Sequence, residues 1–297
     1  MFMSARQSAP PVSHSVGLLF RLQGDGNSIK KRWIILVLVY LLVGCSPRFA
    51  PMIMDAHGVK MVLIPAGKFT MGSDNGSVDQ QPAHVVYLDA YYIDKYEVTN
   101  ALYRDCVEAG ICSLPESTYV YDQNRFANYP VDLVNWYMAD SYCKWRDAHL
   151  PTEAEWEKAA RGTDGRTYPW GNEFNGEYAN YCDINCTDMG NKYFNDGFGN
   201  EAPVGSFIQG VSPYGVFDMA GNAAEWVSDW KDPFYYRSSP YKNPPGPETG
   251  STRVVRGGSF WDPDTSLIVT SRNSHSPFEY FPGLGFRCAI NAMNENK

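Results

Sequence analysis

The stretch of sequence that decides the fold consists of three blocks near the C-terminus: Asp218-Met-Ala-Gly-Asn-Ala-Ala-Glu-Trp226, Arg253-Val-Val-Arg-Gly-Gly-Ser-Phe260 and Gly283-Leu-Gly-Phe-Arg-Cys-Ala289. No cysteine lies between Cys186 and Cys288. The first two blocks therefore cannot supply a thiolate to any site that they help to form.

The 297-residue chain is 44% hydrophobic and 14% aromatic, which is enough to bury a sizeable core in one large domain. Its 26 Gly and 20 Pro are scattered without a period, as in a loop-rich globular protein. The formal charge is −8, and residues 1–44 hold five basic residues and one acidic residue, so the remainder carries 20 basic and 32 acidic side chains. Such a domain should repel nucleic acid, and we expect no nucleic-acid partner.

The strands are predicted to be short. Residues 61–72 indicate two strands around a Pro-Ala-Gly turn, and residues 85–93 indicate one longer, mostly apolar strand. Beyond Arg161 the pattern predicts loops and short strands, without repeats and without a domain boundary after about residue 58.

Three helices are predicted from hydrophobic spacing and capping signals. The first runs from about residue 100 to 108 and the second from about residue 137 to 148. The third opens at Thr152, which forms a capping box with Glu155, and Trp156 is expected to face the core.

Six further blocks lie upstream of the first three. They are Ile64-Pro-Ala-Gly-Lys-Phe-Thr-Met-Gly72, Glu97-Val-Thr-Asn100, Tyr142-Cys-Lys-Trp145, Leu150-Pro-Thr-Glu-Ala-Glu-Trp156, Ala159-Ala-Arg-Gly162 and Tyr168-Pro-Trp-Gly171. Together, in this order and spacing, the nine blocks resemble the sulfatase-modifying-factor family over about residues 58–291. The resemblance implies an irregular, loop-rich α+β fold of the formylglycine-generating-enzyme type, related to C-type lectins. The best-known enzyme of that family converts a cysteine of sulfatases into formylglycine, using copper held by two cysteine thiolates.

The N-terminus resembles an export signal. Lys30-Lys-Arg32 precedes an apolar run over residues 33–43, which is shorter than the ~20 residues that a spanning helix needs. The run ends at Leu42-Val-Gly-Cys45, which looks like the lipobox of a bacterial lipoprotein. The alternative is an uncleaved anchor helix, and both interpretations place the domain outside the cytoplasm.

The domain boundaries follow from this assignment. We expect a signal peptide over residues 1–44, of which 1–29 could reflect a start codon placed too far upstream, and a lipid on Cys45 that anchors the protein to the bacterial cell membrane. A tether (45–57), the sulfatase-modifying-factor domain (58–291) and a short tail (292–297) complete the chain.

The seven cysteines predict a disulfide framework. A lipid on Cys45 leaves six, and the close pairs Cys106–Cys112 and Cys182–Cys186 are each near enough in sequence for a local bridge. Elimination then pairs Cys143 with Cys288, a bridge that the family resemblance supports independently. Metal binding is the weaker alternative, because no Cys-x-x-Cys occurs and an oxidising compartment favours disulfides.

The resemblance implies two structural calcium sites. A hard cation needs several oxygen ligands, which Asp/Asn/Gly-rich loops can supply. One set comprises Asp218 and Glu225 through their side chains and Gly221 and Ala223 through their carbonyls. The other comprises Asn180, Tyr181, Asp196 and Phe198 in the same alternating fashion. The alternative is that these polar residues only cap turns.

The copper chemistry of the family lacks its ligands here. In the generating enzyme one cysteine follows Gly-Gly-Ser and a second comes five residues later, whereas this chain has Asp262 at the first place and no cysteine within residues 263–268. Ala224 stands where an aromatic residue helps to form the family's site. No copper is therefore expected, and Ser259, Arg272 and Asp262 are the cleft remnants that could serve another chemistry. For Ser259 the structural alternative is a turn, and for Arg272 it is pairing with a carboxylate.

The remaining candidates are aromatic. The five histidines are dispersed, which disfavours an iron site, whereas loop aromatics are what glycan and peptide clefts use for stacking. We expect a groove lined by Tyr235, Tyr236, Trp261 and Tyr280. The sequence thus predicts a binding or accessory member of the family, with a glycan, a peptide or an envelope protein as ligand. The alternative is an enzyme of another reaction type that uses the same cleft.

Overall fold

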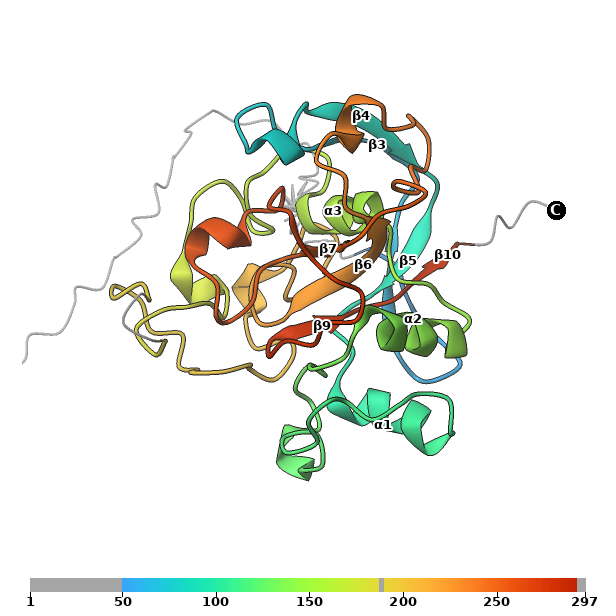
Figure 1. Cartoon of the computed structure of the whole chain (residues 1–297). Coiled ribbons are helices and arrows are strands. Elements are labelled where there is room, and N and C mark those ends of the chain that lie inside the picture. The colour runs from blue at the N-terminus through green and yellow to red at the C-terminus, as the bar shows by residue number, and fades with distance from the viewer. Residues whose placement is uncertain (1–49, 187–189, 293–297) are drawn as a thin grey trace, which may run out of the picture. The chain divides into compact units, whose positions relative to one another are not determined.

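The computed structural model describes residues 50–186 and 190–292 of the chain (Figure 1). The predicted signal peptide, Cys45 and the last five residues of the tail lie outside this part. Within it, three α-helices and ten short strands are joined by long loops. No helix among the described residues is long and apolar enough to cross a membrane.

The first sheet joins the two ends of the domain. Its strand order is β1 (Met52–Met54), β2 (Lys60–Ile64), β5 (Tyr91–Asp94) and β10 (Ala289–Asn291), and all neighbours are antiparallel. Strand β1 falls in the segment that the sequence analysis assigned to the tether, so the sheet begins before residue 58.

The predicted strand over residues 85–93 is divided between two sheets. Strand β4 (His84–Leu88) pairs with β3 (Gly67–Met71), whereas β5 joins the first sheet. The chain changes sheets at Asp89, whose backbone N–H donates to Asn243 Oδ1 while its carboxylate accepts from Asn243 Nδ2. A contact from a distant loop thus fixes a break that local hydrophobicity does not show.

The third sheet brings the three C-terminal blocks together. Strand β6 (Ala224–Trp230) lies between β7 (Arg253–Arg256) and β9 (Leu284–Phe286), and β8 (Asn273–His275) borders β7. The β6–β9 pair is parallel, with Glu225 opposite Gly285. Each block contributes one strand to this sheet, which explains why the three blocks decide the fold.

Each helix begins directly after a residue whose side chain caps it. Helix α1 (Asn100–Glu108) is capped by Thr99, α2 (Trp136–Trp145) by Asn135, and α3 (Glu153–Arg161) by the predicted capping box. Helix α2 ends three residues before the predicted end, because Asp147 adopts a left-handed conformation with φ 55°.

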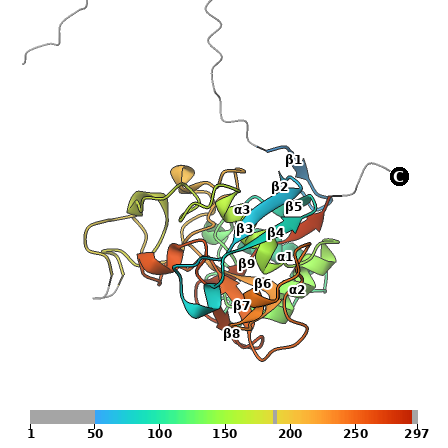
Figure 2. The same ribbon diagram turned by 90° about the horizontal axis from the view of Figure 1, so that it is seen from above.

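Helix α3 lies in the interior rather than on the surface. All nine of its residues are buried, including four charged side chains besides the capping Glu155. Trp156 packs in the main core with residues of β2, β3, β4 and β6, as predicted. Figure 2 shows these elements on one side of the domain and the loop-rich segment 162–223 on the other.

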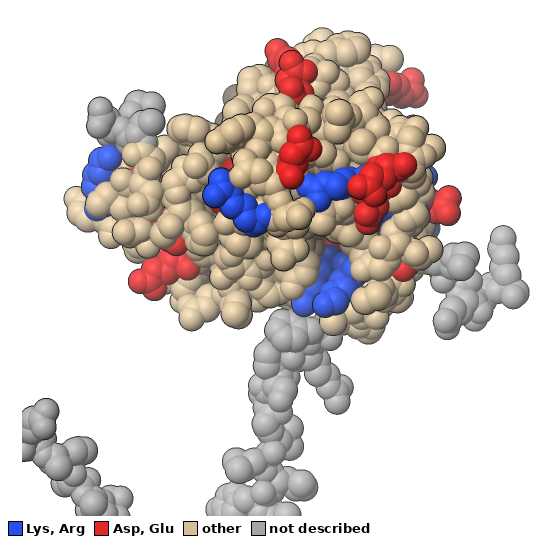
Figure 3. All heavy atoms as spheres, turned by 90° about the horizontal axis from the view of Figure 1, so that it is seen from below, with Lys and Arg blue, Asp and Glu red and all other residues tan. Residues whose placement is uncertain are grey.

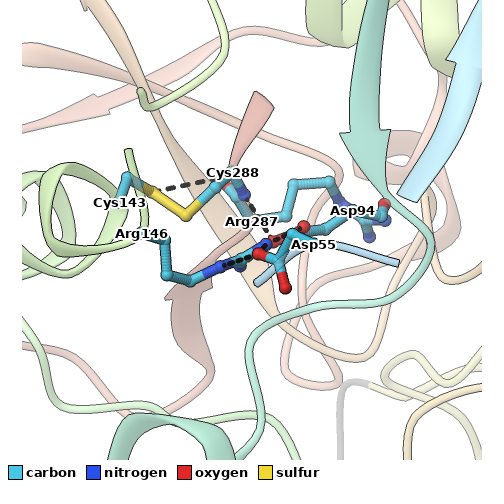
Figure 4. The surroundings of a disulfide bond; sticks show 6 residues. All are labelled: Asp55, Asp94, Cys143, Arg146, Arg287 and Cys288. Atoms are coloured by element: carbon cyan, nitrogen blue, oxygen red, sulfur yellow. Dashed lines mark hydrogen bonds and ion pairs between the residues drawn. A yellow bond between two sulfur atoms is a disulfide. The ribbon is translucent and has the colours of Figure 1, made fainter. Parts of the chain in front are cut away.

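All three expected disulfides are present: Cys106–Cys112, Cys143–Cys288 and Cys182–Cys186. Figure 4 shows that Cys143–Cys288 lies beside Arg146. That guanidinium forms ion pairs of 2.7 Å with both Asp94 and Asp55. The bridge and the ion pairs together attach the C-terminal end of α2 to strand β5 of the first sheet and to the turn between β1 and β2.

Candidate functional site

The loop Gly257-Gly258-Ser259 follows β7 and forms the centre of the predicted cleft. Both glycines have positive φ, 91° and 70°, a conformation that favours glycine. A Cβ on Gly258 would lie 3.1 Å from the side chain of Leu267. The backbone therefore passes close against packed neighbours and fixes where Ser259 lies.

Ser259 and Asp262 close a tight turn. The Ser259 hydroxyl donates to Asp262 Oδ2 over 2.7 Å, and the Ser259 backbone N–H donates to the same oxygen over 2.9 Å. The hydroxyl in turn accepts from the backbone N–H of Trp261. The structure thus joins two of the three predicted cleft remnants, in an arrangement that a turn alone also explains.

Arg272, the third remnant, is held in place by a carboxylate. Its Nε and Nη2 each donate over 2.7 Å to Glu153, and its guanidinium lies 4.3 Å from the ring centroid of Tyr236. Arg272 and Asp262 both line a small cavity of about 170 Å³, which also reaches Ala224. Arg272 therefore pairs with a carboxylate, that of Glu153, as one of its two interpretations predicted.

The described residues offer no thiolate in this region. Asp262 occupies the first cysteine position of the generating enzyme, and Leu267, five residues later, is fully buried. The six cysteines within residues 50–186 and 190–292 are all consumed by disulfides. Copper held by two thiolates has no ligands in this part of the chain.

An apolar cleft of about 270 Å³ adjoins the loop through Phe260 and Trp261. The opposite wall comes from the segment between α1 and α2, which contributes Tyr119, Phe126 and Tyr129. Trp261 is 47% exposed and therefore accessible to a ligand. We call this cavity the aromatic cleft.

The prediction for the other groove aromatics was wrong. Tyr236 is buried in the main core, and Tyr235 packs against that core. Tyr280 is exposed, and its hydroxyl accepts from Asn135 Nδ2, but it does not line the aromatic cleft. Aromatic content alone could not separate core rings from surface rings, because their neighbours come from distant segments.

Two carboxyl groups, Asp132 and Glu201, lie together in the wall of the aromatic cleft. Their side chains are in hydrogen-bonding contact, and Asp132 Oδ2 accepts from the Gly283 backbone N–H over 3.1 Å. Burial, and secondly the charge of Asp132, raise the pKa of Glu201 to about 8. This pair could not be predicted from the nine blocks, because neither residue stands in one of them.

Comparisons with known proteins agree with this architecture. A family model described as a sulfatase-modifying factor enzyme 1-like domain matches residues 52–292. The chain belongs to this family. The formylglycine-generating enzyme of Bos taurus is 32% identical over 292 residues, which cover 79% of this chain and 75% of the relative.

Two further proteins are similar to this chain, one in sequence and one in structure. A serine/threonine-protein kinase pkn1 of Chlamydia caviae is 33% identical over 77% of this chain but only 38% of its own length. The structure of PvdO from Pseudomonas aeruginosa superposes with a TM-score of 0.68 and 24% identity, covering 82% of this chain and 99% of that one. This second likeness concerns the fold, and it confirms the irregular α+β architecture of the family.

In the calcium set predicted from Asn180, Tyr181, Asp196 and Phe198, the carboxylate of Asp196 contacts the backbone of two other members. Asp196 Oδ2 accepts from the Tyr181 backbone N–H and Asp196 Oδ1 from that of Phe198. Next to Tyr181, the side-chain oxygen of Asn180 is buried and accepts no hydrogen bond. A buried amide oxygen without a hydrogen-bond donor, next in sequence to a residue whose backbone contacts Asp196, fits a hard cation that prefers oxygen ligands.

The calcium set predicted from Asp218, Gly221, Ala223 and Glu225 fits a cation less well. The carboxylate of Glu225 is bonded to Arg287 and to Trp156 Nε1, so its oxygens already have partners. Asp218 instead lies close to Glu97, whose Oε2 is buried without a partner, and burial followed by the charge of Asp218 raises the pKa of Glu97. Glu97 is thus an acidic neighbour of Asp218 that does not belong to either predicted calcium set.

Proposed function

We propose that this protein is an extracytoplasmic, lipid-anchored member of the sulfatase-modifying-factor family whose cleft binds a ligand and does not oxidise cysteine. The supporting observation is the pair Ser259–Asp262 at the position of the first copper cysteine. Monovalent copper prefers thiolates, whereas Asp262 supplies a hard oxygen that already accepts two hydrogen bonds.

The aromatic cleft beside this pair supports the binding role. Rings such as Trp261, Phe126 and Tyr129 offer the flat apolar surfaces on which sugars and peptide side chains stack. Figure 3 shows one face of the domain, on which basic and acidic side chains are interspersed. That distribution agrees with a glycan, peptide or envelope-protein ligand rather than a nucleic acid.

The anchor is proposed from the sequence, since Cys45 lies outside the described residues. Three disulfides support an oxidising compartment. Replacing Cys45 by Ser should release the protein from membranes or leave an unprocessed precursor, as judged by fractionation and by the mass of the mature N-terminus. Unchanged fractionation with an unchanged N-terminal mass would contradict the anchor.

The absence of oxidase activity can be tested directly. Purified full-length protein in detergent, supplied with copper, oxygen and a peptide containing Cys-x-Pro-x-Arg, should leave the peptide mass unchanged. Conversion of the peptide thiol to an aldehyde at an enzyme-dependent rate would overturn the proposal.

The binding role needs a separate experiment. A glycan and peptide array should reveal a ligand whose retention falls when Trp261 is changed to Ala. Tyr193→Ala provides a matched control, because Tyr193 is 94% exposed and does not line the aromatic cleft. Equal binding by both variants would place the ligand elsewhere.

An enzyme of another reaction type is the second candidate, favoured by the 2.7 Å contact between Ser259 and Asp262 at the edge of a cavity. In that case Ser259→Ala should abolish turnover of the array ligand while its binding persists. Under the binding proposal the ligand is recovered unchanged from both proteins.

A further inference from the structure

The carboxyl pair Asp132–Glu201 is the polar part of an otherwise largely apolar cleft. The cavity, about 270 Å³, has room for a side-chain-sized group, and aromatic rings line it together with the two acids. Both acids are partly buried, and Glu201 Oε1 is shielded from solvent without any hydrogen-bond donor. A buried carboxyl oxygen without a donor is costly unless a ligand satisfies it.

No basic side chain of the cleft compensates this pair. Besides the two acids, the titratable groups among the lining residues are Tyr119 and Tyr129, and the lining includes no Lys, Arg or His. The exposed Arg125 stacks over the ring of Phe126 at 4.7 Å, where solvent screens its charge. Backbone N–H groups contribute to both acids: that of Gly283 donates to Asp132 and also acts on Glu201, yet Glu201 Oε1 has no hydrogen-bond partner. The cleft therefore combines unfilled acceptors with an excess of negative charge.

We propose that the aromatic cleft binds an organic ammonium group, whose N–H donors reach Asp132 and Glu201 while its carbon stem lies against the rings. This inference rests on the proposed binding function and specifies the chemical class of its ligand. Three properties of the site match such a ligand: hydrogen-bond acceptors for N–H groups, negative charge, and ring faces that attract cations.

Binding should release a proton. Burial and the neighbouring Asp132 raise the pKa of Glu201 to about 8, so the pair retains one proton at neutral pH. An ammonium group supplies both donors and positive charge, so it can take the place of that proton. Release should approach one proton per ligand near pH 7 and vanish well above pH 8, where the pair is already ionised.

The test is calorimetric titration of the full-length protein in detergent with n-butylammonium, in two buffers of different ionisation enthalpy. The neutral analogue n-pentanol serves as the control ligand. We expect n-butylammonium to bind with proton release at pH 7 and n-pentanol to bind at least tenfold more weakly. Equal affinity for the two would overturn the inference.

Variants assign the effect to the carboxyl pair. Glu201→Gln and Asp132→Asn should each weaken n-butylammonium binding at least tenfold and abolish proton release. Glu116→Gln is the matched control, because Glu116 is exposed on the same segment as Asp132 but does not line the cleft. Unchanged melting temperatures show that the variants are folded, and unchanged binding in folded Glu201→Gln and Asp132→Asn would refute the assignment.

The source of the ammonium group can be separated with two further probes. Nα-acetyl-lysine amide represents a protein side chain, and glucosamine, compared with N-acetylglucosamine, represents an amino sugar. Binding of either amine supports the inference and indicates its source. If no amine binds but a neutral array ligand binds in a Trp261-dependent manner, the inference fails while the proposed binding function stands.

Discussion

Arg287 and Glu225 form a bidentate ion pair in the interior of the domain. The Nη2–Oε1 and Nε–Oε2 distances are 2.6 and 2.7 Å, and the two side chains are 0% and 1% exposed. Trp156 Nε1 donates to the same carboxylate over 2.9 Å. The pair therefore connects the buried helix α3 with the two parallel strands that precede and follow the cleft loop.

Removing one partner of this pair should be costly. Arg287→Met leaves the Glu225 carboxyl group buried without its cationic partner, near Glu97 and Asp218, so we expect the free energy of unfolding to fall by about 3–5 kcal/mol. Urea denaturation measures the loss. Lys144→Met is the control, since it breaks an exposed pair with Asp140 and should cost less than about 1 kcal/mol. Similar losses in both variants would contradict this prediction.

The long disulfide should stabilise more than a short one. Cys143 and Cys288 are separated by 145 residues, and the chain-entropy model gives about 5 kcal/mol for a loop of this size. The same model gives about 2 kcal/mol for Cys106–Cys112, which are separated by six residues. Double Cys→Ala variants of each pair, compared by denaturant unfolding, should show the larger loss for the long bridge. Equal losses would indicate that loop length does not control the effect.

The pH dependence of stability should contain a contribution from Asp229. Burial, and secondly the charge of Glu153, raise the pKa of Asp229 to about 7 in the folded protein, against about 3.9 in an unfolded chain. Between these values the unfolded state loses its proton while the folded state keeps it. The contribution of Asp229 therefore falls as pH rises from about 4 to 7, by at most about 4 kcal/mol, and is constant above that range.

Asp229→Asn tests this contribution. The amide oxygen can still accept from the Glu153 backbone N–H, which now donates to Asp229 Oδ2 over 2.8 Å. The difference in unfolding free energy between variant and parent should grow in favour of the variant from pH 4.5 to 7. Parallel pH profiles would show that Asp229 is not responsible.

Calcium should stabilise the domain through the Asn180–Asp196 set. An ion that binds only the folded state adds about 2.7 kcal/mol per site at a hundredfold excess over its dissociation constant. Chelation should lower the melting temperature, and Asp196→Asn should remove most of that response. Glu177→Gln, an exposed change in a neighbouring turn, should leave it intact. A melting curve indifferent to chelator, with no calcium by elemental analysis, would argue against the site.

Local signals in the sequence were sufficient to predict where helices α1 and α3 begin. Thr99 caps α1 through the N–H of Leu102, and Thr152 caps α3 through that of Glu155, so each signal lies within three residues of its effect. The strand break at Asp89 could not be predicted in this way. It depends on Asn243, which lies 154 residues away in the sequence.

The burial of α3 also could not be predicted from local sequence, because it depends on ion pairs with distant residues. A helix with Glu153, Glu157 and Arg161 has the composition of a solvated surface, because charged side chains are rarely buried unless paired. Here Arg256 pairs with both Glu153 and Glu157 inside the domain, and Arg272 pairs with Glu153. The resemblance identified Ser259, Asp262 and Arg272 as candidate site residues. Only the folded chain shows that Ser259 and Asp262 are hydrogen-bonded to each other and that Arg272 is paired with Glu153.

The Cys143–Cys288 bridge has a consequence for proteolysis. Loop segment 162–223, which contains no strand or α-helix among its described residues, lies entirely between the two cysteines. A protease that cuts this segment would produce two polypeptides that remain covalently joined, with the Tyr119–Tyr129 wall of the aromatic cleft on one and Trp261 on the other. The nicked molecule would keep both walls and would migrate as two fragments only after reduction.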